Sequence, residues 1–149
     1  MMLVARFIHI LGFTVWIGGM FFAYMALRPV AATVLQPAQR LPLWAGVFGK
    51  FFFWVWLAVA LLFASGFHMM ALLGKPPAYA LVMLALGTAM LLIFAHVFFS
   101  PYKRLQRAVA AQDWPAGGAA LGRIRFLVGA NLILGILTMC VGALGPLSG

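Results

Sequence analysis

An uninterrupted apolar segment decides the fold of this chain: residues 51–73 read FFFWVWLAVALLFASGFHMMALL. The segment contains no Lys, Arg, Asp or Glu. About 20 apolar residues in a helix are enough to cross the hydrocarbon core of a bilayer, because each residue adds about 1.5 Å. Residues 51–73 are therefore predicted to form a transmembrane helix.

Three further runs of the same kind surround this segment, at about residues 3–27, 79–100 and 126–144. The first is followed by Arg28-Pro29 and the third by Pro101, and proline opposes the continuation of a helix. The sequence therefore predicts an all-α fold. It is an integral membrane four-helix bundle that forms a single transmembrane domain over residues 1–149.

The composition excludes an ordinary water-soluble domain. Hydrophobic residues make up 66% of the chain and charged residues 7%, whereas soluble domains are about half apolar and a quarter charged. The net charge of +9 arises from ten Lys and Arg against a single acidic residue, Asp113. These basic residues flank the apolar runs, which indicates a lipid bilayer as the partner and not nucleic acid.

The distribution of basic residues predicts the orientation of the bundle. Cytoplasmic loops of membrane proteins are enriched in Lys and Arg. One side carries only Arg6 and Lys75, and the other carries most of the basic residues: Arg28, Arg40, Lys50, Lys103, Arg104, Arg107, Arg123 and Arg125. We therefore expect both termini on the non-cytoplasmic side.

All three histidines, His9, His68 and His96, fall inside predicted spans, where an ionisable side chain is costly and indicates function. His9 and His68 are both expected roughly 8 to 9 Å below the outer end of their helices, while His96 lies near the inner end of its span. Two imidazoles at one depth can serve as the axial ligands of haem b. His96 can act separately, at a quinone or a second metal.

The surroundings of the histidine pair fit a haem. Gly12 and Trp16 share a helix face with His9, and a glycine there leaves room for a flat ring. Arg6 and Lys75 lie on the same outer side, where they can pair with haem carboxylates. We therefore expect cofactor contacts from His9, His68 and these four residues. Electron transfer is the leading function. If the chain is an enzyme, we expect a membrane oxidoreductase.

Copper is the alternative ligand, because thioether and thiolate sulfur suit Cu(I) and imidazole suits either oxidation state. The candidate set is His9 and His68 together with Met69, Met70 and Cys140. Uptake or transfer of copper is the function that such a site predicts. A second alternative is an accessory subunit of a larger membrane complex, or a homo-oligomer, without any cofactor.

Small and polar residues form a stripe on the last predicted span: Asn131, Gly135, Thr138 and Gly142. Such stripes allow helices to approach closely in membranes. We expect this one to be structural, with an interhelical hydrogen bond from Asn131.

Two of the predicted spans resemble the copper resistance D (CopD) domain family. In the first span, residues 7–11 read FIHIL, residues 15–22 read VWIGGMFF and residues 27–29 read LRP; in the third, residues 94–102 read FAHVFFSPY. The resemblance covers nearly the whole chain and matches His9 and His96 directly. It implies a multi-pass protein of the bacterial inner membrane that is linked to copper.

The same pattern is remotely similar to HemJ-type protoporphyrinogen oxidases and to membrane cytochromes b. That similarity implies haem, with a quinone or another redox partner. The chain lacks the Leu-Pro-Arg run expected in HemJ-type proteins after Trp16-Ile17-Gly18-Gly19.

Overall fold

The computed structural model describes residues 1–147, and these form an all-helical protein. Four helical stretches are long and apolar enough to cross a membrane: Met2–Val34, Pro37–Leu73, Ala78–Ala110 and Trp114–Leu147. The predicted all-α, four-span fold is confirmed. The side of the membrane on which the termini lie stays a prediction.

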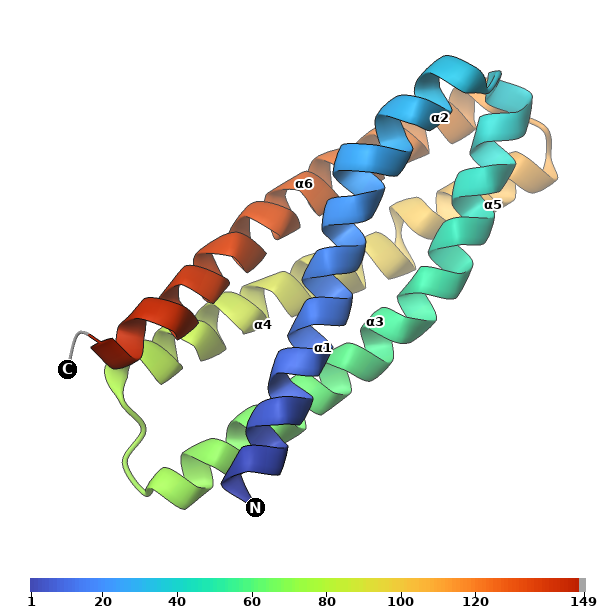
Figure 1. Ribbon diagram of the computed structural model, residues 1–149. Helices are drawn as coiled ribbons and strands as arrows, with labels where there is room; N and C mark the ends of the chain where they lie inside the picture. The colour runs from blue at the N-terminus through green and yellow to red at the C-terminus, as the bar shows by residue number, and fades with distance from the viewer. Residues whose placement is uncertain (148–149) are drawn as a thin grey trace.

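The four stretches pack as two pairs that lie side by side (Figure 1). In the first pair, α1 (Met2–Phe22) packs against α3 (Pro37–Leu73). In the second, α4 (Ala78–Phe99) and α5 (Pro101–Ala110) pack against α6 (Trp114–Leu144). Both termini and the 74–77 connection lie at one end of the bundle, called here the terminal end (Figure 1).

The sequence predicted that the first span ends at Arg28-Pro29, and this prediction is wrong. A π-helical turn, η1 (Ala23–Leu27), follows α1, and α2 (Arg28–Val34) continues the helix. In this turn the Arg28 N–H donates to the carbonyl of Ala23, five residues back. The wider turn interrupts the α-helical hydrogen bonds where the ring of Pro29 would otherwise meet them, so the proline begins α2 instead of ending the span.

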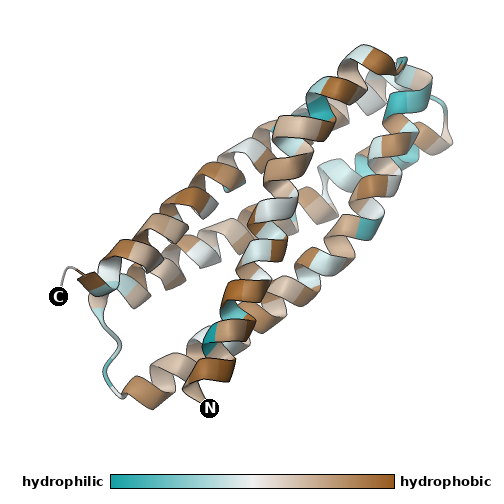
Figure 2. Ribbon diagram, viewed as in Figure 1, coloured by the Kyte–Doolittle hydropathy of each residue, from teal (hydrophilic) through white to brown (hydrophobic). Residues whose placement is uncertain are grey.

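The second and fourth spans also extend beyond the predicted bounds, since α3 begins at Pro37 and α6 at Trp114. At about 1.5 Å per residue, helices of 37 and 31 residues exceed the roughly 30 Å of a hydrocarbon core. Hydropathy detects only the part of a helix that fits the lipid. The extensions reach the end opposite the termini, where most hydrophilic residues gather (Figure 2).

The third span ends as predicted, at Ser100, and the chain continues as a basic amphipathic helix, α5. Tyr102 and Leu105 are buried against the bundle, whereas Lys103 and Arg104 are exposed. The last element of the described residues is η2 (Gly145–Leu147), a short 3-10 turn after α6.

Aromatic rings dominate the core. The rings of Phe48 and Phe52 stack with centroids 5.1 Å apart, and Phe94 packs edge-on against Phe52 at 5.4 Å. In α4 the buried residues are Met90, Phe94 and Val97, and none of residues 78–89 is buried. The core is therefore tightest away from the terminal end.

Candidate functional site

His9 of α1 is held by hydrogen bonds to α3, near the terminal end of the bundle. Its Nδ1 atom lies 3.1 Å from the carbonyl oxygen of Leu62 and 3.0 Å from Oγ of Ser65. The imidazole is half-buried. These contacts bring together residues more than 50 positions apart and fix the ring between the two helices.

The partners of Nδ1 determine the tautomer of His9. A backbone carbonyl oxygen can only accept a hydrogen bond, so the Nδ1 atom beside Leu62 carries the proton. The hydroxyl of Ser65 donates its own proton to the carbonyl of Leu61, at 2.6 Å, and is free to accept from His9. The neutral form of His9 is therefore the Nδ1–H tautomer, in which Nε2 keeps a lone pair that can bind a metal.

Local sequence explains why the imidazole fits against α3. Ser65 bonds to its own helix four residues back, as serine does in helices, and this presents its oxygen at the surface of α3. The next residue is Gly66, where a Cβ atom would lie 3.3 Å from Cε1 of His9. Neither residue was predicted as a partner of His9, although both lie about two turns before the end of α3, which matches the depth of His9.

Gly12 and Trp16 lie on the helix face of His9, as predicted, but the space beside them is filled. A Cβ atom at Gly12 would lie 3.0 Å from the carbonyl oxygen of Ala58 and 3.2 Å from Cγ of Leu62. Trp16 is buried and packs edge-on against Phe94, with centroids 6.2 Å apart. The glycine therefore serves the close approach of α3 and leaves no open slot for a flat ring.

His68 lines a separate groove between α1 and α3, with a volume of about 330 Å³. Ser65 contributes to this groove and also bonds to His9, but His9 does not line it. The remaining lining residues are Met1, Val4, Ala5, Ile8, Leu61 and Ala64. The two histidines predicted to pair are thus neighbours of one serine without sharing a cavity.

The other predicted site residues are dispersed. His96, Cys140, Arg6 and Lys75 are exposed, and Met69 and Met70 are half-buried. Within residues 1–147, no three or more side chains of His, Cys, Asp or Glu come together in a way that could hold a metal ion. A metal site in this part of the chain therefore needs other donors besides these side chains, such as methionine sulfur or amide oxygen.

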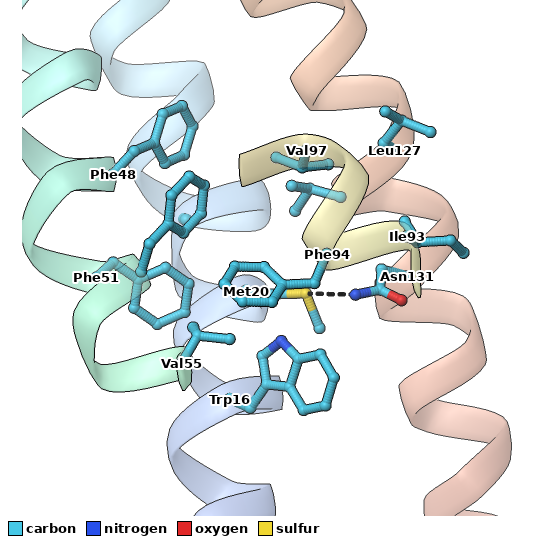
Figure 3. Close-up of a pocket in the computed structure, with 13 residues that line it drawn as sticks. Trp16, Met20, Phe48, Phe51, Val55, Ile93, Phe94, Val97, Leu127 and Asn131 are labelled. Atoms are coloured by element: carbon cyan, nitrogen blue, oxygen red, sulfur yellow. Dashed lines mark hydrogen bonds between the residues drawn. The ribbon is translucent and has the colours of Figure 1, made fainter. Parts of the chain in front are cut away.

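A second polar position lies in the middle of the core, where Asn131 of α6 meets Met20 of α1 (Figure 3). The Nδ2 atom of Asn131 donates to Sδ of Met20 over 3.9 Å, which confirms the predicted interhelical bond from Asn131. Its Oδ1 atom is buried and has no hydrogen-bond partner in the described structure. Both residues line a small cavity of about 20 Å³.

The fold and these two positions define a multi-pass membrane protein whose interior polar groups are the half-buried imidazole of His9, thioethers, the amide of Asn131 and the hydroxyls of Ser65 and Thr138, with no buried carboxylate in the part of the chain described. A family model named Copper resistance protein D (CopD) matches residues 45–144, which is more than half of the chain. The chain belongs to the CopD family. The match begins within α3, so α1 and His9 precede it. No curated protein and no solved structure matches the chain.

Proposed function

We propose that this protein binds Cu(I) within the membrane and passes it on, with Nε2 of His9 as a ligand. The observation that carries the proposal is the hydrogen bond from Nδ1 of His9 to the carbonyl of Leu62. Metal-binding histidines generally donate their second ring N–H to a carbonyl or carboxylate, which orients the ring. Membership of a family named for copper resistance supports copper as the metal.

The donor atoms of the chain favour a soft monovalent ion. Its single acidic residue, Asp113, caps the start of α6 by accepting a hydrogen bond from the Ala116 N–H at 3.0 Å. The chain therefore offers no pair of acidic side chains for Mg²⁺, Ca²⁺ or Mn²⁺, which need several oxygen ligands. The nine methionines and three histidines provide thioether and imidazole, which suit Cu(I).

The α1–α3 contact prepares His9 for this role. Ser65 and the Leu62 carbonyl hold one edge of the ring, and Gly66 allows the ring to lie close to α3. A ring fixed in this way loses little conformational entropy when Nε2 binds an ion. Copper here is cargo, and no change in its oxidation state is part of the proposal.

The test is the copper content of purified protein after exposure to Cu(I) and removal of unbound metal. We expect His9→Ala to lose bound copper relative to wild type. His96→Ala is the matched control, because His96 is exposed and has no hydrogen bond to another helix within residues 1–147. Equal copper in wild type and His9→Ala would contradict the proposal.

Haem b bound by His9, with electron transfer to a quinone or other redox partner, is the second candidate, since the same Nδ1 bond suits an axial haem ligand. The described residues fit it less well, because α3 fills the space beside Gly12 and His68 opens onto a groove that His9 does not line. Protein produced with sufficient haem is expected to be colourless. A Soret band that His9→Ala abolishes would favour haem over copper.

A cofactor-free accessory subunit is the third possibility from the sequence. Copper-free protein that still copurifies with a partner complex after all three histidines are replaced by alanine would favour it.

A further inference from the structure

Asn131, whose side-chain oxygen has no hydrogen-bond partner in the described structure, lines a small cavity in the centre of the bundle. Asn131 and Met20 are each only 3% exposed. A buried amide oxygen without a hydrogen bond is costly, and such groups in native proteins usually have a water, an ion or a function. The cavity of about 20 Å³ accepts one particle of the size of a water molecule or a metal ion, and excludes a haem.

The walls of this cavity are suited to a soft cation. The thioether of Met20 is the sulfur ligand that Cu(I) prefers, and the amide of Asn131 supplies oxygen. The rings of Trp16, Phe52 and Phe94 also line the cavity, and aromatic faces attract cations. No acidic side chain is among the lining residues, so a monovalent ion fits better than a divalent one.

Two more methionines lie against the small-residue stripe of α6, toward the terminal end. Thr138 donates to Sδ of Met90 over 3.8 Å, and Met90 is almost completely buried. One turn further, Sδ of Met83 lies 3.3 Å from the position that a Cβ atom would occupy at Gly142. Three of the four residues of this stripe thus have the sulfur of a methionine beside them.

The register of the helices places His9 at the outer end of this row of methionines. Helices α1 and α6 are antiparallel, because Met20 meets Asn131 while Ile17 packs over Gly135. His9 precedes Ile17 by about two turns, so it is level with residues about two turns after Gly135, near Gly142. Met83, Met90 and Met20 therefore lie at successive depths between the level of His9 and the centre of the bundle.

The backbone beside the cavity is irregular. The π turn η1 begins at Ala23, which lines the cavity. Single π turns within α-helices are often found at functional sites. Here the turn begins three residues after Met20.

We propose that Met20 and Asn131 form a second Cu(I) site in the centre of the membrane, reached from the level of His9 past Met83 and Met90. The proposal rests on the copper function proposed above and names a second position for the same cargo. A half-turn of the Asn131 amide brings Oδ1 to the place where Nδ2 now meets Sδ of Met20. Met20 and Asn131 then both present lone pairs to the ion.

The experiment is an oxygen-free titration of the purified full-length protein with Cu(I), in competition with a chromophoric Cu(I) chelator. Wild type is expected to bind two ions per chain, Met20→Leu one, and His9→Ala one. Leucine is close to methionine in volume and is usually tolerated in cores, so the fold is expected to survive. Met25→Leu, in the same helical stretch but exposed, is the matched control and keeps both ions.

A second variant separates a ligand role from a structural one. Asn131→Leu replaces the amide and its unpaired oxygen with an apolar side chain of similar size. The only partner left behind within residues 1–147 is the weakly accepting thioether of Met20, so little desolvation cost remains. We expect Asn131→Leu to melt at or above the temperature of wild type and yet to bind one Cu(I) fewer.

The outcomes distinguish this inference from the function on which it rests. Wild type without any bound Cu(I) would contradict both. If His9→Ala loses an ion while Met20→Leu and Asn131→Leu bind as many as wild type, the central cavity holds water and this inference alone is wrong.

Discussion

At the scale of single residues, hydrogen-bond partners distinguish histidines that the sequence treated alike. Because His9 and His68 lie at the same depth in the membrane, the sequence predicted that they form a pair. Depth, however, does not determine the rotation of each helix about its own axis, and so not the direction in which a side chain points. In the structure His9 contacts α3 through Leu62 and Ser65, and His68 lines the neighbouring groove. Rotation depends on packing between helices, which a single sequence does not reveal.

Ser65, a hydrogen-bond partner of His9, provides a test of the proposed Cu(I) ligand at this scale. Ser65→Ala removes one of the two groups that hold Nδ1, and loss of such a supporting bond typically costs about 10- to 100-fold in metal affinity. We therefore expect Ser65→Ala to weaken Cu(I) binding by roughly tenfold or more, measured by competition with a Cu(I) chelator.

Thr88→Ala is the matched control for the serine variant. Thr88 makes the same bond to its own helix, to the Leu84 carbonyl at 2.8 Å, but is exposed and contacts no histidine by hydrogen bond in the described residues. If both variants bind copper as tightly as wild type, Ser65 has no part in orienting His9.

At the scale of helices, apolar run length predicted the number and order of the spans but not their ends. The length of an apolar run reports only the residues that lie in lipid. The predicted bounds of α3 and α6 therefore did not include the extensions of these helices beyond the membrane. Pro29 was predicted to end the first span, but a π turn precedes it and the helix continues as α2. The break at Ser100 was predicted, since Pro101 follows it directly in the sequence.

The close contact of α1 with α3 predicts a strong effect at Gly12. A side chain there meets the backbone of Ala58, which cannot move aside as a flexible side chain can. We expect Gly12→Val to lower the free energy of unfolding in detergent by about 1–3 kcal/mol, as followed by thermal or denaturant melting.

Gly18 on the same helix is the control for this substitution. A Cβ atom at Gly18 meets nothing within 4 Å, so Gly18→Val removes a glycine without creating a clash. Equal destabilisation by the two variants would show that the α1–α3 approach does not depend on a small residue at Gly12.

At the scale of the whole molecule, the charge distribution agrees with the arrangement of the chain. Both termini and the 74–77 connection share one end, as an even number of spans requires (Figure 1). Most Lys and Arg lie toward the other end, which the sequence analysis assigned to the cytoplasm. The sequence could predict this arrangement because it depends on connectivity and charge, not on side-chain packing.

The orientation itself is testable by labelling intact cells. In a Cys140→Ala background, Lys75→Cys places a thiol in the outer connection and Ala111→Cys places one in the inner connection, and both positions are exposed. An impermeant maleimide is expected to label the first variant and not the second. The reverse pattern would invert the topology and place His9 at the cytoplasmic side.

The most direct test of the central claim is the copper X-ray absorption spectrum of Cu(I)-loaded protein. If His9 is a ligand, the wild-type spectrum contains the outer-shell scattering of an imidazole ring, and His9→Ala lacks it while His68→Ala and His96→Ala retain it. A wild-type spectrum without imidazole scattering, or one that His9→Ala leaves unchanged, would contradict the assignment of His9 as the entry ligand for copper.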